Sequence, residues 1–107
     1  MVKRFMRVLV FFDLPVETSR QRSEYAKFRR SLIKDGYLMK QESVYSKLVL
    51  NPQTAKLAIN RIKTNLPKEG LVQALIVTEK QFASIQTLLG EDYSRVELST
   101  TDRLVIV

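Results

Sequence analysis

The stretch FMRVLVFFDLP, residues 5–15, decides the fold of this chain. Its first eight residues are rich in Val, Leu and Phe and have the composition of a buried β-strand. Because Pro15 cannot donate to a sheet ladder, we expect the strand to end within a residue or two of Asp13. Asp13 is the only acid among the first sixteen residues, and it would stand at the rim of the sheet. Two interpretations remain open: a carboxylate placed for metal or phosphate chemistry, or a turn cap before the following helix.

The length and the net charge of the chain limit the kinds of partner and site that it can have. The 107 residues are enough for one domain with a single core. The chain carries 18 Lys and Arg against 11 Asp and Glu, a formal net charge of +7. This balance favours nucleic acid or another anionic surface as the partner. A domain this small is expected to work on a surface or between subunits, and we expect no small-molecule substrate.

The chain contains no Cys and no His. Disulfides, zinc sites, thiol nucleophiles and imidazole catalysis are therefore excluded, and any chemistry must use carboxylates, hydroxyls or a bound metal. The basic start is followed by an apolar stretch that Arg7 interrupts and Asp13 ends, which is too short for a secretory or membrane-spanning segment. We expect a soluble, cytoplasmic protein without a membrane partner.

Periodicity and capping signals predict the elements after the first strand. They are a helix over 19–34, two strands dividing 37–50 near 40–43, a helix from Pro52 to Leu66, a strand over 71–77, a short helix opened by Thr78 with Phe82, Ile85, Leu88 and Leu89 inside, and a last strand over 104–107. Strand, helix, strand, strand, helix, strand is the ferredoxin-like split βαβ order of an α+β sandwich. The short helix and the C-terminal strand are appended to it.

The last strand, Leu104, Val105, Ile106 and Val107, is too apolar to lie exposed on a monomer. The sheet edge of a neighbouring chain would accommodate it. We therefore divide the single domain into a core of about residues 1–90 and a dimer-forming segment, residues 91–107. The uncovered face of the sheet is expected either to be polar or to pack against its twin.

Four features, in their order and spacing, resemble the small CRISPR-associated adaptation protein family, the second Cas protein and partner of the spacer integrase. They are the strand ending in Phe12-Asp13, the pair Arg20 and Arg22, the stretch Gln41-Glu42-Ser43-Val44-Tyr45, and the run Val77-Thr78-Glu79-Lys80-Gln81-Phe82. The similarity spans nearly the whole chain. The chain departs from the family where Phe12 replaces a common Tyr, and where Glu42 and Tyr45 stand in a motif that often reads Gln-Tyr-Ser-Val-Phe.

The resemblance implies a ferredoxin-like protomer in a two-fold dimer with a swapped terminal strand. It also implies that Asp13 is a magnesium ligand, or a manganese ligand in its place, shared between subunits, and the essential residue of a nuclease. Magnesium usually takes one or two carboxylates plus waters, so a second Asp13 across a two-fold axis would complete such a site. The alternative is that two Asp13 residues only flank a dimer groove.

Basic residues of the first predicted helix are candidate phosphate contacts. They are Arg20, Arg22, Lys27, Arg30 and Lys34. All but Arg22 recur at spacings of 7, 3 and 4, which places them along one side of the helix, away from its apolar stripe. Such a stripe would give affinity without sequence preference, and the plain alternative is a solvated polar face.

Three functions compete at this point. The first is a homodimeric adaptor that binds double-stranded DNA and bridges integrase subunits during CRISPR spacer acquisition. The second is a metal-dependent endonuclease acting on RNA or DNA through paired Asp13, including a toxin-type ribonuclease. The third is an RNA-binding module without catalysis, although the glycine-aromatic signature of such modules is missing from residues 43–50.

Overall fold

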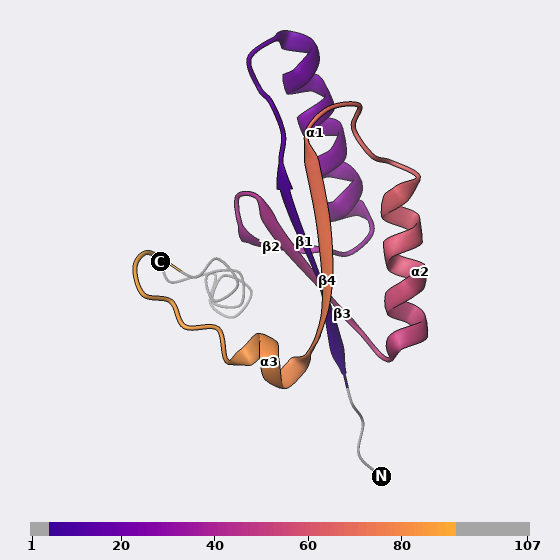
Figure 1. Ribbon diagram of the computed structural model, residues 1–107, viewed down its shortest axis with the longest axis vertical. Coiled ribbons are helices and arrows are strands. Elements are labelled where there is room, and N and C mark those ends of the chain that lie inside the picture. Colours follow the sequence, from indigo (N-terminus) through magenta and orange to yellow (C-terminus); the bar gives the residue numbers. More distant parts are fainter. Residues whose placement is uncertain (1–4, 92–107) are drawn as a thin grey trace, which may run out of the picture.

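The computed structural model describes residues 5–91, and the strand predicted for 104–107 lies outside them. The elements are β1 (Met6–Asp13), α1 (Ser19–Lys34), β2 (Leu38–Gln41), β3 (Val44–Val49), α2 (Pro52–Lys63), β4 (Leu71–Thr78) and α3 (Glu79–Ala83) (Figure 1). The four strands form one antiparallel sheet in the order β2-β3-β1-β4. This is the predicted ferredoxin-like arrangement, in which β1 and β2 are separated by β3.

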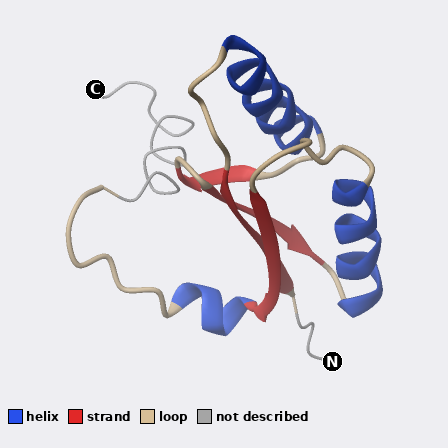
Figure 2. Cartoon of the chain, turned by 45° about the horizontal axis from the view of Figure 1, so that its top comes forward, coloured by secondary structure: helices blue, strands red, loops and turns tan. Residues whose placement is uncertain are grey.

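The core lies between this sheet and helices α1 and α2, which cover the same side of it (Figure 2). Alternate residues of β1 point to that side, and Val8 and Val10 are fully buried. Phe12 is the aromatic centre, with ring centroids 5.3 Å from Phe28 and 5.6 Å from Tyr45. The strand that opens the sequence is therefore also the centre of the packed layer.

All three helices begin with a capping box, which explains why their starts are where the sequence predicts them. Thr18 and Gln21 exchange hydrogen bonds at the start of α1. Asn51 and Thr54 do so at α2, where Pro52 occupies the first helical position. Thr78 opens α3 in the same way.

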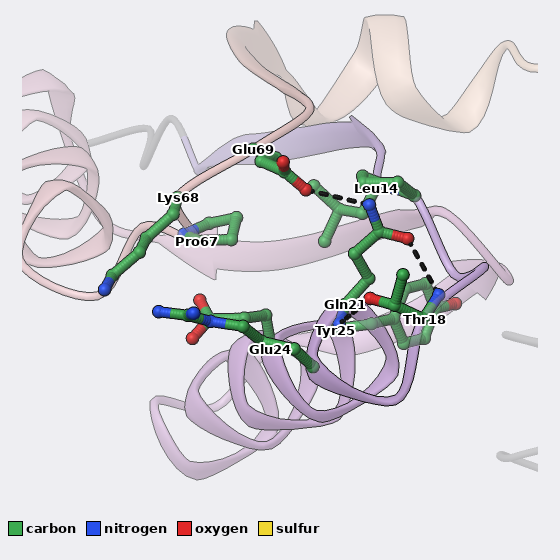
Figure 3. Close-up of a pocket in the computed structure, with 10 residues that line it drawn as sticks. Leu14, Thr18, Gln21, Glu24, Tyr25, Pro67, Lys68 and Glu69 are labelled. Atoms are coloured by element: carbon green, nitrogen blue, oxygen red, sulfur yellow. Dashed lines mark hydrogen bonds between the residues drawn. The ribbon is translucent and has the colours of Figure 1, made fainter.

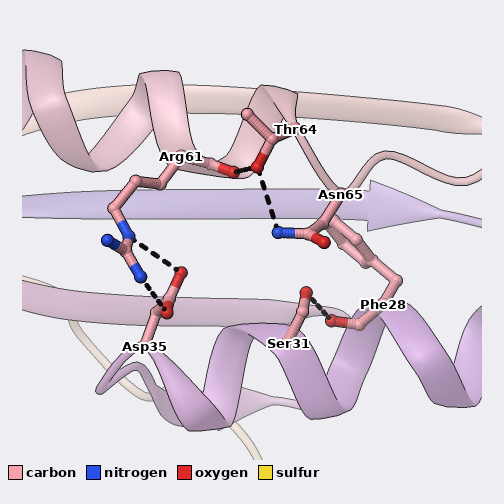
Figure 4. A network of polar contacts seen from close by, with 6 residues as sticks. All are labelled: Phe28, Ser31, Asp35, Arg61, Thr64 and Asn65. Atoms are coloured by element: carbon pink, nitrogen blue, oxygen red, sulfur yellow. Dashed lines mark hydrogen bonds and ion pairs between the residues drawn. The ribbon is translucent and has the colours of Figure 1, made fainter.

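A polar contact joins the end of α1 to α2 (Figure 4). The Arg61 guanidinium donates to both carboxylate oxygens of Asp35, at 3.0 and 3.5 Å. Its hydrogen bond and positive charge lower the pKa of Asp35 below the usual value. The contact fixes the C-terminal cap of α1 against the second helix on the same side of the sheet.

The short third helix differs from its prediction. It ends at Ala83, and Ile85, Leu88 and Leu89 are exposed rather than packed inside a helix. A helix of one turn depends on tertiary contacts for its stability. Such contacts come from the start of the helix and from Phe82: Glu79 accepts hydrogen bonds from Arg7, and the Phe82 ring lies under the Arg7 guanidinium at 4.4 Å.

The sheet face opposite α1 and α2, called here the open face, is apolar. It carries Leu38, Leu48, Leu71 and Leu75, each between 47% and 53% exposed. The strand alternation places Leu9 and Phe11 among them. The exposed leucines contradict a wholly polar face, and packing of the face against a second copy stays a prediction. In the described part of the chain, no helix is long and apolar enough to cross a membrane.

Candidate active site and nucleic-acid interface

Asp13 is the last residue of β1, and its side chain is exposed. It pairs with Leu71 of β4 in the sheet register. Because successive strand residues alternate between faces, Asp13 belongs to the open face with Phe11, whereas Leu14 turns back into the core. The carboxylate thus stands at the rim of the apolar open face, where the sequence predicts it.

The position of Asp13 depends on a glycine that the sequence analysis did not single out. Gly70 precedes β4 with a φ of +105°, a conformation that L side chains rarely adopt. A Cβ there would lie 2.8 Å from the Asp13 carbonyl oxygen and 2.7 Å from Leu14 Cδ2. Gly70 therefore lets the start of β4 close against the end of β1.

One chain supplies a single acid at this point. Among residues 5–91, no group of three or more His, Cys, Asp or Glu side chains could hold a metal ion. The Asp13 carboxylate makes no hydrogen bond or ion pair to any described residue, so its oxygens are open to a ligand. Hard oxygen donors of this kind suit magnesium, which completes its shell with water, phosphate or a second carboxylate. The residues fit the ion as one half of a site.

Helix α1 carries the predicted basic stripe on its solvent side. Arg20, Lys27, Arg30 and Lys34 are exposed, while Phe28 and Leu32 of the same helix are buried. The stripe begins beside the strand end, because Arg20 and Leu14 line the same cavity. A cationic surface thus starts close to Asp13 and runs along α1.

Arg22 has a different environment from the other four. Its Nη1 donates to the backbone carbonyls of Val16, at 3.1 Å, and Glu17, at 2.9 Å. The guanidinium therefore holds the loop between β1 and α1 in addition to presenting charge. This role was missed because the carbonyl partners follow from the path of the loop rather than from a helical spacing.

The tyrosines of the described region belong to the core. Tyr45 is fully buried and its hydroxyl accepts a hydrogen bond of 2.7 Å from Arg29 Nε. Tyr37 is 2% exposed, and its hydroxyl has no hydrogen-bond partner within the described residues. Burial, followed by the nearby Asp35 charge, raises the pKa of Tyr37 to about 12. Neither side chain is therefore accessible for stacking on the bases of a nucleic acid.

Arg7 is a second residue of the open face that sequence reasoning left aside. Its guanidinium donates to both Glu79 carboxylate oxygens, at 2.7 and 3.2 Å, and stacks on Phe82. The sequence signal for this role was a single Arg within an otherwise apolar strand. The contact anchors α3 at the end of β1 opposite Asp13.

Comparison with known proteins places these features in a family. The family model of CRISPR associated protein Cas2 matches residues 6–85. A curated relative from Treponema denticola, named CRISPR-associated endoribonuclease Cas2, is 50% identical over 102 residues, covering 95% of this chain and 100% of its own length. A relative of the same name from Ligilactobacillus salivarius is 44% identical over the same shares. A third, from Acidovorax ebreus, is 51% identical over 85 residues, 79% of this chain and 83% of its own.

Proposed function

Since this chain belongs to the CRISPR associated protein Cas2 family, we propose that it acts in spacer acquisition as a dimer that binds duplex DNA and bridges integrase subunits. The observation that carries the proposal is the apolar open face with Asp13 at its rim. Two copies packed through this face would bury the exposed leucines and bring two Asp13 side chains toward one axis.

The basic stripe of α1 supplies the DNA surface in this proposal. Its cations are exposed and lie on the opposite side of the sheet from the dimer face. Dimerisation would therefore leave both stripes accessible to phosphates. Contacts of this type give affinity that is independent of sequence, as an adaptor for arbitrary DNA requires.

A matched pair of leucines tests the dimer. Leu75 on the open face is 52% exposed and Leu57 on α2 is 62% exposed. Leu75→Asp should yield a monomer by sedimentation, because a buried unpaired carboxylate opposes the interface. Leu57→Asp should remain a dimer. A parent protein that sediments as a monomer, or fails to retain the integrase subunit from the same locus in a pull-down, would refute the proposal.

The same protein is proposed to be a metal-dependent endonuclease, and two observations support this second activity. Its curated relatives carry the name endoribonuclease, and the Asp13 carboxylate is open to ligands. Magnesium bound there would polarise a phosphodiester and assist attack by water. Asp13 would hold the ion, together with Asp13 of the second copy, while the cations of α1 hold the nucleic acid in place.

The Asp13→Ala variant tests the nuclease. It should remain a dimer of unchanged stability, because the side chain is exposed and makes no hydrogen bond or ion pair within the described residues. Cleavage of single-stranded RNA or duplex DNA in magnesium should fall to the level seen with a chelator. Cleavage at the parental rate by the purified variant would show that the activity has another origin.

A further inference from the structure

A cavity of about 270 Å³ lies between the first turns of α1 and the segment that joins α2 to β4 (Figure 3). Its apolar walls include Leu14, Tyr25 and Pro67. The Tyr25 ring is fixed edge-on against Phe12, with centroids 6.0 Å apart. The cavity is slightly smaller than the roughly 300–1,000 Å³ of sites for drug-sized ligands, which suits a single flat ring system.

The polar side of the cavity is held in place by Gln21. Its Oε1 accepts from the backbone N–H groups of Glu17, at 2.9 Å, and Thr18, at 3.0 Å, while its Nε2 donates to Glu69 at 2.9 Å. Glu69 is thereby engaged. The half-buried Glu24 also lines the cavity, and its carboxylate makes no hydrogen bond or ion pair to any described residue. Glu24 is therefore an acceptor without a donor in a preformed site.

Two cations complete the lining. Arg20 and Lys68 come from α1 and from the segment before β4, and both are exposed. They suit a phosphate group at the mouth of the cavity. The apolar walls suit the flat face of a nucleotide base, and the free carboxylate suits N–H donors on the edge of that base. The two cations suit the phosphate of the same nucleotide.

We propose that this cavity binds a guanine nucleotide of the nucleic acid, with Glu24 reading the base. Guanine presents two adjacent N–H donors on its Watson–Crick edge, which one carboxylate accepts together. Adenine presents one donor beside a ring nitrogen that a carboxylate repels. The assignment rests on the proposed endonuclease activity, because the Watson–Crick edge of guanine is open to Glu24 in an unpaired strand such as single-stranded RNA and is closed by base pairing in duplex DNA.

The cavity also has a defined relation to Asp13. Leu14 lines the cavity and directly follows Asp13, but the two side chains leave the end of β1 on opposite faces. The cavity and the Asp13 carboxylate thus lie on opposite sides of the end of β1, and the nucleotide site is separate from the proposed metal site. Glu24 is a specificity residue in this arrangement and takes no part in bond cleavage.

Titration of the full-length ¹⁵N-labelled protein with 5′-GMP and 5′-AMP, in the absence of divalent metal, tests the assignment. GMP should shift the amide signals of residues 18–25 and of Lys68 and Glu69, and it should bind about tenfold more tightly than AMP, the discrimination expected for a bidentate base contact. Glu24→Gln should reduce this preference to near parity, since an amide opposes a donor to one of the two guanine donors. Glu17→Gln, an exposed change in the neighbouring loop, is the matched control and should retain the preference.

Three results would overturn the assignment: no shifts with GMP, equal affinity for GMP and AMP with shifts confined to Arg20 and Lys68, or a preference that survives Glu24→Gln. The titration requires neither a dimer, a metal nor cleavage. A monomeric or inactive protein that still prefers GMP would contradict the proposed function alone. A dimer that cleaves single-stranded RNA in magnesium but shows no preference for GMP would contradict the nucleotide site alone.

Discussion

Among the three glycines of this chain, Gly70 is the one whose replacement by Ala should disturb the Asp13 site most. All three have positive φ, at +105° for Gly70, +95° for Gly36 and +96° for Gly90. Only Gly70 also meets backbone, since its added Cβ would lie 2.8 Å from the Asp13 carbonyl oxygen and 3.1 Å from Leu14 Cα. At Gly36 the nearest atom is the Lys47 Cε, at 3.7 Å, which is ordinary contact.

The expected cost has two parts. A non-glycine residue in this backbone region costs on the order of 1–3 kcal/mol, and both Gly70→Ala and Gly36→Ala incur it. Carbon atoms pack at about 3.5–4.0 Å, so at Gly70 the neighbouring backbone must also move by several tenths of an ångström. Overpacking of this kind adds about 1–3 kcal/mol. Gly70→Ala should therefore be less stable than Gly36→Ala by about 1–3 kcal/mol, and the strain common to both cancels in the comparison.

Urea denaturation of the two variants measures this difference, and cleavage in magnesium measures its consequence. Because the atoms displaced at Gly70 belong to Asp13 and Leu14, this variant should also need more magnesium for half-maximal cleavage at temperatures where it is fully folded. Gly36→Ala should keep the parental magnesium dependence. Equal destabilisation by the two substitutions would refute the packing argument, and an unchanged magnesium dependence in Gly70→Ala would refute its link to Asp13.

Three further predictions address the basic residues, the buried tyrosine and the C-terminal segment. Arg20→Ala should reduce the salt slope of duplex DNA binding by about one, with unchanged stability. Arg22→Ala should also lower the midpoint of urea denaturation, because the Arg22 guanidinium holds two loop carbonyls. Equal urea midpoints for the two variants would contradict this distinction. Burial raises the pKa of Tyr37 from 10.0 to about 12, so its contribution to stability is complete below pH 10 and is lost as the pH rises through 12, by up to roughly 3 kcal/mol. Tyr37→Phe should be at least as stable as the parent at pH 7, since the hydroxyl is unpartnered among the described residues, and should remove that alkaline loss in pH-dependent denaturation. A chain that ends at Ser99 should sediment as a monomer or aggregate, because the swapped strand is proposed to complete the dimer; a soluble dimer of parental stability would contradict the swap.

The predictable part of this structure is encoded in short stretches of sequence. Pro15 ends the first strand, and the three capping boxes at Thr18, Asn51 and Thr78 begin the helices where the sequence indicates. The division of residues 37–50 into two strands was also predicted, although no Gly or Pro marks the turn. Each of these features can be predicted from the local sequence alone, because the interacting groups lie within a few residues of one another.

The features that were missed depend on contacts between distant parts of the chain. Gly70 acquires its role only when the register of β4 brings it beside Asp13. The third helix was likewise predicted to extend through Leu88 and Leu89, because an apolar period does not reveal whether a surface exists to bury it. The same limitation applies to Glu24, whose isolation in a cavity follows from the fold and from the hydrogen bonds of Gln21.

The alternate side chains of β1 that lie on the open face have different roles. Arg7 anchors α3 through Glu79 and Phe82 at one end, Leu9 and Phe11 form the apolar middle, and Asp13 stands exposed at the other end. Because these side chains belong to one central strand, the spacing between them is fixed. If the face is the dimer interface, any shift of the two copies along β1 would move the anchor of α3 and the paired carboxylates together. Substitutions at Arg7 should therefore alter metal-dependent cleavage at Asp13 without touching it, which couples the packing of α3 to the proposed active site.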